Sequence, residues 1–260
     1  MAYRHATTRA GYEDLASGFV LHSAAGFPAF PVRLASEMFQ RALALRAAVG
    51  SAQGADRPVV VWDPCCGSGY LLTVLAVLHR SRIAAVLASD IDQNAVRIAS
   101  RNLELLSQDA LAARAIHLRE QAERFDKSSY VAAADATERI ARGLAAGGGD
   151  VPYAAYRADV FDRDALATVT GKWTPDIVVT DVPYGEQTTW LGPRGDGGVP
   201  GMVRSVTAAL PDEAVIALAA RGRKVPLGDM RPTASFKIGT RAVALRAAGL
   251  LRGSEAAANR

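Results

Sequence analysis

Two short stretches of the sequence hold the residue types that a chemical reaction would need. In one of them, Asp181, Pro183 and Tyr184 follow an apolar run at residues 177–179. A carboxylate can accept a proton from an N–H group, and a tyrosine ring can stack on a planar ring. Asp and Pro are also common in the turns that end strands, so this stretch alone is compatible with an ordinary turn.

The other stretch joins an apolar run to a glycine-containing turn. Val59-Val60-Val61-Trp62 leads into Asp63-Pro64-Cys65-Cys66-Gly67-Ser68-Gly69, and an apolar segment without Gly or Pro follows at residues 71–78. This order predicts a strand, a tight turn and a buried helix, as in a nucleotide-binding unit. Gly67 and Gly69 would let the backbone approach the ligand without a Cβ atom. We therefore expect Asp63, Cys65, Gly67 and Gly69 to belong to a nucleotide-like pocket, in which Cys65 and Cys66 are only small, buried side chains.

The type of nucleotide follows from what the turn lacks. A dinucleotide-binding turn needs a third small residue where this chain has Leu72, and no Gly-Lys-Ser or Gly-Lys-Thr is present to hold a triphosphate. The pattern Asp-Pro-Cys-Cys-Gly-Ser-Gly instead resembles the first motif of class I S-adenosylmethionine (SAM) methyltransferases. Asp90 lies 21 residues after Gly69, near the offset at which a carboxylate accepts the ribose hydroxyls of a nucleotide. Asp159, at the end of another apolar run, completes the expected cofactor site.

Apolar runs and helical patterns alternate along the chain and must position these residues. Strands are predicted at residues 59–63, 84–90, 153–159, 175–181 and 214–219, with helices between them at 71–78, 92–106, 162–169 and 201–210. Residues 233–238 and 241–246 flank Gly239-Thr240 and predict an antiparallel hairpin. The pattern predicts an α/β, doubly wound, Rossmann-like sheet of seven strands with an antiparallel edge hairpin. Its first and fourth strands would be neighbours, so the glycine turn and Asp181 would face one crevice.

Two segments fall outside this alternation. Residues 1–57 are expected to form an N-terminal arm and a helix, from about 33 to 50, that packs on the core, while residues 58–260 form the methyltransferase domain. The arm is rich in aromatic residues, Gly and Pro, and it would either close over the cofactor or cover a sheet edge; the sequence leaves both possibilities open. Residues 108–147 hold two more helical stretches, an inserted helical hairpin whose six basic and six acidic residues indicate a solvated surface.

Composition and charge limit the class of protein further. No apolar run in the 260 residues reaches the length of a membrane span, and Arg4, His5 and Arg9 occupy the start of the chain, where a secretory signal would be apolar. We therefore expect a cytoplasmic protein without a membrane partner. The four histidines are scattered, which indicates no metal site.

Residues 221–260 carry nine Lys and Arg against two acids, a net charge of +7. This predicts an RNA-binding face that includes Arg221, Arg223, Lys224 and Arg231.

The two chemical stretches together narrow the resemblance. Asp181-Val182-Pro183-Tyr184 resembles the (Asp/Asn)-Pro-Pro-(Tyr/Phe) motif of methyltransferases that act on nitrogens of planar bases, with Val182 in place of the first Pro. With the glycine turn and the arm segments 20–23 and 27–33, it is similar to the avilamycin-resistance ribosomal RNA methyltransferases over most of the chain. The resemblance implies SAM-dependent methyl transfer to a guanine nitrogen, N1, of large-subunit rRNA, with resistance to an orthosomycin antibiotic as the outcome. The implied partner is 23S rRNA or the large ribosomal subunit, and we expect a monomer.

The resemblance also implies roles for the second stretch. Asp181 would be the polar catalyst, Tyr184 the platform on which the base stacks, and Pro183 the residue that stiffens the loop. Methylation of a pyrimidine carbon is disfavoured, because residues 181–186 contain no Cys nucleophile. Two alternatives stay open: a small-molecule N-methyltransferase of antibiotic biosynthesis, and a SAM-binding or RNA-binding module without turnover.

Overall fold

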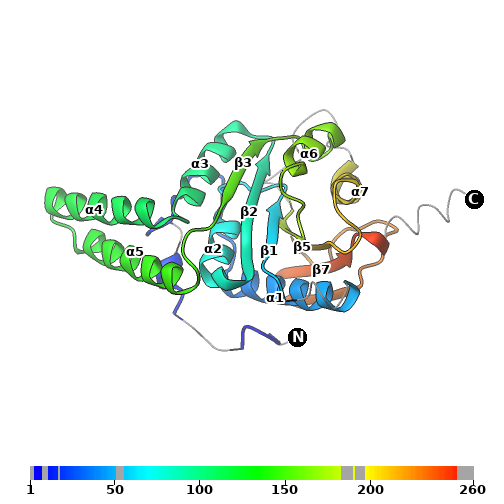
Figure 1. Ribbon diagram of the computed structural model, residues 1–260, viewed down its shortest axis with the longest axis horizontal. Helices are drawn as coiled ribbons and strands as arrows, with labels where there is room; N and C mark the ends of the chain where they lie inside the picture. The colour runs from blue at the N-terminus through cyan, green and yellow to red at the C-terminus, as the bar shows by residue number, and fades with distance from the viewer. Residues whose placement is uncertain are drawn as a thin grey trace, which may run out of the picture.

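A mixed sheet of seven strands runs through the molecule (Figure 1). The computed structural model describes residues 3–7, 11–16, 18–50, 56–182, 190 and 197–250. The strand order is β3-β2-β1-β4-β5-β7-β6, in which β7 is antiparallel to both of its neighbours and the other pairs are parallel. This confirms the predicted sheet, its antiparallel edge and the neighbouring first and fourth strands. The strands are β1 (Val59–Asp63), β2 (Ile83–Asp90), β3 (Tyr153–Arg157), β4 (Ile177–Asp181), β5 (Val215–Arg221), β6 (Ala234–Ile238) and β7 (Arg241–Ala247).

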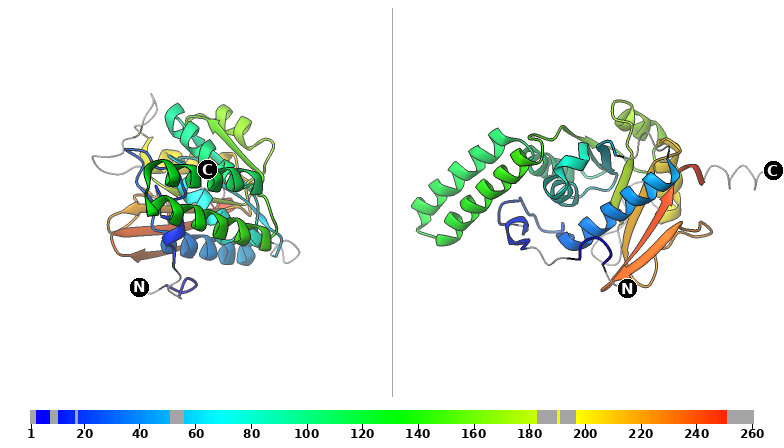
Figure 2. Two further views of the ribbon diagram at one scale, coloured as in Figure 1. Left: turned by 90° about the vertical axis from the view of Figure 1, so that its left-hand side faces the viewer. Right: turned by 60° about the horizontal axis from the view of Figure 1, so that its bottom comes forward.

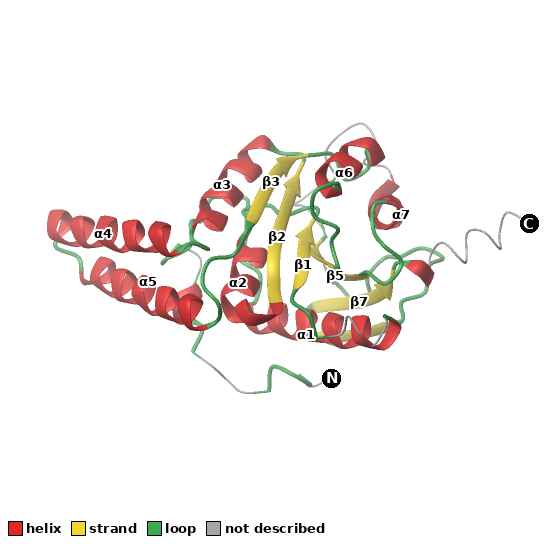
Figure 3. Ribbon diagram, viewed as in Figure 1, coloured by secondary structure: helices red, strands yellow, loops and turns green. Residues whose placement is uncertain are grey.

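Helices cover both faces of the sheet (Figure 3). One face, here called the α1 face, packs against α1 (Val32–Val49), α2 (Tyr70–Leu78) and α3 (Gln93–Glu104). The opposite face packs against α6 (Arg163–Thr170) and α7 (Gly198–Ala208). Successive side chains of a strand point to opposite faces, so Val61 lies in the core of the α1 face and Trp62 in the other core. Two single-turn 3₁₀ helices lie at Glu13–Leu15 and Arg80–Arg82.

The predicted inserted hairpin is present as α4 (Gln108–Phe125) and α5 (Ser128–Ala146). The two helices lie antiparallel and extend away from the sheet, as Figure 2 shows. At 1.5 Å per residue each helix is about 27 Å long. Arg119 forms ion pairs with Asp135 (3.1 Å) and Glu138 (2.6 Å), as expected for a solvated, salt-bridged surface. In the described part of the chain no helix is both long and apolar enough to cross a membrane.

A single arginine joins the base of this hairpin to the sheet. The guanidinium of Arg80 donates to the backbone carbonyls of Gly148 (3.0 Å) and Asp150 (2.7 Å), just after α5, and to that of Ile83 (2.8 Å), at the start of β2. A charged donor makes stronger hydrogen bonds to carbonyls than a neutral donor does. Arg80 therefore fixes where α5 returns to the sheet.

Two buried carboxylates join α1 to other parts of the chain. Asp176, just before β4, accepts hydrogen bonds from Arg46 of α1 (2.9 Å), from Arg57 and from the backbone N–H of Val60 (2.9 Å), and it is only 2% exposed. Breaking such a pair would leave an uncompensated buried charge. Asp176 thus ties α1 to the amino ends of β1 and β4.

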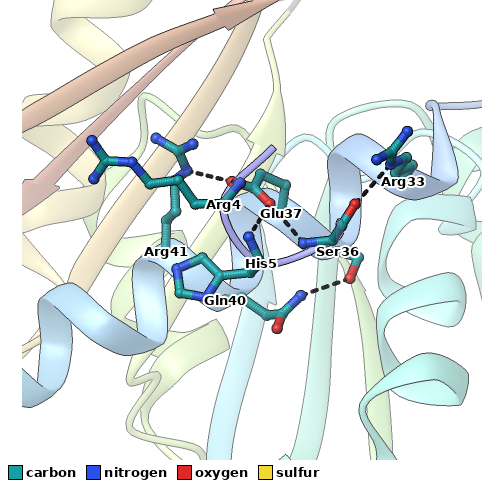
Figure 4. Close-up of polar contacts among 8 residues, drawn as sticks. Arg4, His5, Arg33, Ser36, Glu37, Gln40 and Arg41 are labelled. Atoms are coloured by element: carbon teal, nitrogen blue, oxygen red, sulfur yellow. Dashed lines mark hydrogen bonds and ion pairs between the residues drawn. The ribbon is translucent and has the colours of Figure 1, made fainter. Parts of the chain in front are cut away.

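Glu37 of α1 is the second of these carboxylates and binds the N-terminal segment (Figure 4). Its side chain is fully buried and accepts hydrogen bonds from the backbone N–H groups of Arg4 (2.7 Å), His5 (2.9 Å) and Ala6 (2.9 Å). Arg41, one turn along α1, pairs with it at 2.7 Å. Burial raises the pKa of Glu37, but these four donors outweigh it and lower the pKa to about 2. The carboxylate therefore holds residues 4–6 on α1 as a charged group.

Candidate active site

A cavity of about 400 Å³ opens at the carboxyl ends of β1, β2 and β4. Ligand sites of α/β sheets lie at this edge, where the strand order reverses. Its wall comes from the glycine turn, from the segments that follow β2, β3 and β4, and from the arm. The lining residues are Gly26, Phe27, Pro28, Phe30, Asp63, Pro64, Cys65, Cys66, Gly67, Ser68, Tyr70, Leu71, Asp90, Ile91, Asp92, Ala158, Asp159, Val160, Phe161, Asp181, Val182 and Trp190.

The strand register brings carboxylates from three strands to one side. Val61, Ala88 and Val179 belong to the core of the α1 face. Because side chains alternate, the residues two positions later, Asp63, Asp90 and Asp181, point to that same face. Asp159 joins them from the segment after β3, where its carboxylate accepts a hydrogen bond from the N–H of Phe161 (2.9 Å). The cavity is therefore strongly acidic and suits a ligand that carries positive charge and hydroxyl groups.

Asp63 is buried behind the turn. It is 2% exposed and accepts a hydrogen bond from the N–H of Cys65 (3.1 Å). Burial raises its pKa to about 7, while the Thr180 hydroxyl and the Cys65 N–H lower it. Burial and neighbouring carboxylates raise the pKa of the Cys65 and Cys66 thiols well above their ordinary value, so both side chains remain protonated.

Asp90 shapes the glycine turn as well as lining the cavity. One of its oxygens accepts a hydrogen bond from the N–H of Gly67 (2.9 Å), and the other accepts one from the N–H of Asp92 (3.0 Å). Burial raises its pKa and outweighs these hydrogen bonds, which lower it. Asp92 itself caps α3 by accepting a hydrogen bond from the N–H of Asn94 (2.8 Å).

The two glycines of the turn each leave space for another part of the chain. Both have positive φ, +52° at Gly67 and +71° at Gly69. A Cβ on Gly69 would lie 2.9 Å from the Cα of Ala99 in α3, and one on Gly67 would lie 3.3 Å from the ring of Phe27 in the arm. Among the described residues the cavity wall includes Gly67 but not Gly69. The absent Cβ atoms thus make room for α3 at Gly69 and for the arm at Gly67, and Gly67 also lines the cavity.

Asp181 ends β4 with its side chain 21% exposed. Arg241, at the start of β7, donates from Nη2 to its Oδ2 at 3.3 Å. The sequence counted Arg241 only as part of a basic segment, yet it is buried beside the cavity.

Val182 packs in the opposite core, and its N–H donates to the carbonyl of Ala219 (2.9 Å). A Pro at this position could not donate that bond, which explains the departure from the motif. Pro183 and Tyr184 lie outside the described residues.

The arm forms one wall of the cavity, which favours the first of its two expected roles. Asn102 of α3, fully buried, accepts a hydrogen bond from the N–H of His22 (2.7 Å) and donates to the carbonyls of His22 (3.0 Å) and Ser68 (2.9 Å). The Tyr70 hydroxyl donates to the carbonyl of Leu15 (2.7 Å). Sequence reasoning missed Asn102, although a polar residue three positions after Ala99 interrupts the apolar stripe of α3 and is a usable signal.

Two aromatic side chains outside the arm were also missed. The rings of Phe161 and Trp190 meet edge to face, with their centroids 5.2 Å apart, and both line the cavity. Phe27 and Phe30 line it from the arm. Flat apolar surfaces beside carboxylates suit a planar heterocycle that has polar edges.

None of the four predicted RNA-binding residues lines the cavity, and Arg231 lies toward the other edge of the sheet, because its carbonyl contacts Arg246, which pairs with Ile216 near the amino end of β5. Asp181 pairs with Ala219 of β5, so Arg221 extends two residues beyond it at the same edge of the sheet. Arg221, Arg223, Lys224 and Arg231 are exposed. The guanidinium of Arg246, another cation of this segment, donates to the carbonyls of Arg231 and Leu250. Part of the basic segment therefore serves the fold, and the four predicted residues are on the surface.

Comparison with known proteins gives consistent matches. A family model described as "rRNA methyltransferase AviRa" matches residues 1–241. A relative from Streptomyces viridochromogenes, named 23S rRNA (guanine(2535)-N(1))-methyltransferase, is 52% identical over 251 residues, which are 96% of this chain and 98% of the relative. Two solved structures of the rRNA methyltransferase AviRa from that organism have a TM-score of 0.89, at 48% identity over 97% of this chain and 99% of theirs, and at 50% over 98% and 99%. The similarity thus extends over the arm, the sheet and the inserted helices.

Proposed function

Because the chain belongs to the AviRa family of rRNA methyltransferases, as the resemblance indicated, we propose that it transfers a methyl group from SAM to N1 of a guanine in 23S rRNA. The observation that carries the proposal is the position of Asp181, which faces the same cavity as the glycine turn. We propose the same nucleotide that the relative's name gives, guanine 2535, and resistance to an orthosomycin antibiotic as the outcome. A small-molecule methyltransferase and a non-catalytic module are not favoured by these relatives.

The residues of the cavity fit SAM. A volume of about 400 Å³ lies in the range of small-molecule sites. Bound SAM supplies a methyl group on a positively charged sulfur, and the strand-end carboxylates attract that charge. Asp90 would accept hydrogen bonds from the ribose hydroxyls, while Asp63, Cys65, Gly67 and Asp159 would line the rest of the cofactor. Gly69 would contribute through the shape of the turn.

Removing the Asp90 carboxylate is expected to weaken SAM binding. Hydrogen bonds to a charged group are worth about 1.5–3 kcal/mol, so Asp90→Ala should raise the dissociation constant for SAM at least about tenfold. Isothermal calorimetry measures this directly. Asp159→Ala provides a comparison, and thermal unfolding checks that the turn remains folded without the Gly67 bond. Unchanged SAM affinity in folded Asp90→Ala would remove Asp90 from the cofactor site.

The acceptor side of the proposal rests on Asp181. Guanine N1 carries a hydrogen, so its lone pair is unavailable until that proton leaves. The Asp181 carboxylate would accept the N1 proton as the methyl group arrives and would later release it to solvent. Tyr184 would stack on the flipped base and Pro183 would stiffen the loop that holds it, roles that rest on the sequence motif. One chain supplies every group that this step needs, so we propose that the protein works as a monomer. We also propose that it works in the cytoplasm, where ribosomes are.

Exposed cations at the end of β5 would bind the RNA backbone. Phosphate contacts set affinity and orientation without selecting a sequence. Replacing Arg223 and Lys224 together by Ala is expected to weaken binding of all RNAs and to reduce the slope of log K against log salt by about 1.4, at roughly 0.7 per contact on single-stranded RNA. Binding assays across a salt series measure the slope, with SAM affinity expected to stay constant. An unchanged slope would mean that Arg221, Arg223, Lys224 and Arg231 form an ordinary solvated surface.

The direct test uses methyl-labelled SAM with 23S rRNA. We expect label in the RNA at N1 of one guanine, located by mass spectrometry of nuclease fragments. The same RNA transcribed with adenosine at that position is the control and should stay unlabelled. Label only in a small-molecule extract would overturn the proposal, and so would label on a base other than guanine. Assembled large subunits, tested in parallel, decide which form of the rRNA is the substrate.

A further inference from the structure

Arg241 reaches the site from the antiparallel edge of the sheet. Asp181 pairs with Ala219 of β5, and Arg221, two residues later in β5, pairs with Arg241 of β7. Residues in register share a face, so all of these side chains lie on the α1 face. The small side chain of Ala219 leaves space above β5. The Arg241 guanidinium can therefore cross that strand to the Asp181 carboxylate, 3.3 Å away.

The position of Arg241 is costly for a cation. Its side chain is only 9% exposed. An arginine is seldom buried unless it is paired, because removal of the charge from water must be offset. The guanidinium carbon also lies 5.0 Å from the centre of the Phe30 ring, within the range of a cation–π interaction. Arg241 thus contacts two residues of the cavity wall, one at the end of β4 and one in the arm.

Arg241 changes both the charge and the hydrogen bonding around the Asp181 carboxylate. Asp63 and Asp90 point to the same face, so the negative charge of Asp181 has two other carboxyl groups near it. The Arg241 guanidinium offsets that charge and offers a fixed hydrogen-bond direction to Oδ2. An ammonium group could supply the charge but not the planar donor geometry.

We propose that Arg241 is a positioning residue for methyl transfer: it holds the Asp181 carboxylate in the orientation that receives the guanine N1–H and joins it to Phe30 of the arm. The inference rests on the proposed role of Asp181. Arg241 itself is not among the residues that line the cavity. Its effect on the reaction passes through Asp181, and this gives a specific kinetic signature.

The test measures kcat, KM and SAM affinity for Arg241→Met, Arg241→Lys, Asp181→Asn and the double variant. A misplaced catalytic group costs about tenfold or more, so Arg241→Met should lower kcat by that factor with SAM affinity within about twofold. Arg241→Lys should recover part of the loss. The double variant should be no slower than Asp181→Asn alone, because the arginine acts only through the carboxylate. Arg246→Met, on the same strand, is the matched control and should keep the wild-type kcat.

The possible failures are distinct. If Asp181→Asn retains full activity, the proposed role of Asp181 is wrong and the inference fails with it. If Asp181→Asn is impaired but folded Arg241→Met keeps the wild-type kcat, only the inference is overturned. Additive losses in the double variant would also overturn it, because Arg241 would then act elsewhere. If Arg241→Met does not fold, Arg241→Lys, which keeps the buried charge, carries the same comparison with Asp181→Asn.

Discussion

Asp181→Asn is expected to reduce the turnover number for rRNA methylation about 100-fold or more, with SAM affinity unchanged. The substitution keeps the shape of the side chain, but a neutral amide cannot accept the N1 proton of guanine. Asp181 lines the cavity at the end of β4 and is held there by Arg241 of β7, so the cofactor side should be unaffected. Single-turnover kinetics with labelled SAM and saturating rRNA isolate the chemical step.

The matched control is Asp135→Asn on the projecting hairpin, which makes the same chemical change at a surface ion pair. It should keep the wild-type rate. Wild-type turnover in Asp181→Asn would show that another group receives the proton. A parallel loss of SAM binding would place Asp181 in the cofactor site instead.

Glu37→Gln is expected to lower the free energy of unfolding at pH 7 by up to about 3 kcal/mol. The ordinary pKa of a glutamate is 4.5, and Glu37 has a folded-state pKa of about 2, because its four hydrogen-bond donors outweigh burial. A lowered pKa stabilises the fold fully above pH 4.5, and this contribution disappears as the pH falls toward 2. The neutral amide of the variant would mimic the protonated acid at every pH. The stabilities of the two proteins should therefore differ at neutral pH and converge between pH 4.5 and 2.

Urea denaturation at a series of pH values measures this convergence. His22 and His79 have pKa values lowered to about 4 by burial, so their effects fall mainly between pH 4 and 6.5 and are common to both proteins. Glu120→Gln, an exposed glutamate on α4, is the control and should follow the wild-type curve. A constant difference at all pH values would mean that packing, and not the charge of Glu37, is responsible.

The sequence predicted those parts of the fold and site that depend on local patterns. Runs such as Val59-Val60-Val61 have the branched side chains of buried strands, and the acid that ends a strand can be seen from its neighbours. Asp90 and Asp181 could therefore be placed at the cavity in advance. The end of β5 was less clear: the strand continues to Arg221, two residues past its predicted end at residue 219, because β7 supplies pairing partners there.

Contacts between distant segments could not be predicted in this way. Arg241 is 60 residues from Asp181, and Asn102 is 80 residues from His22. In the sequence Arg241 looks like the other cations of a basic segment, since burial depends on strands that pair far along the chain. Gly69 illustrates a different limit. A glycine is expected in a turn of this kind, but the close approach of Ala99 to Gly69 can be seen only in the folded structure, where α3 packs against the turn.

The hydrogen bonds that hold the arm and the N-terminal segment have a consequence for how the sequence can diverge. Glu37, Tyr70 and Asn102 lie in helices of the body, and each bonds backbone atoms: those of residues 4–6, of Leu15 and of His22. Any residue except Pro at a donating position offers the same N–H, and every residue offers the same carbonyl. Ala6 and Leu15 are themselves buried, so the freedom to diverge while the backbone bonds are kept belongs to the exposed residues Arg4 and His5. Homologous chains should show high variability there and little at Glu37, Tyr70 and Asn102.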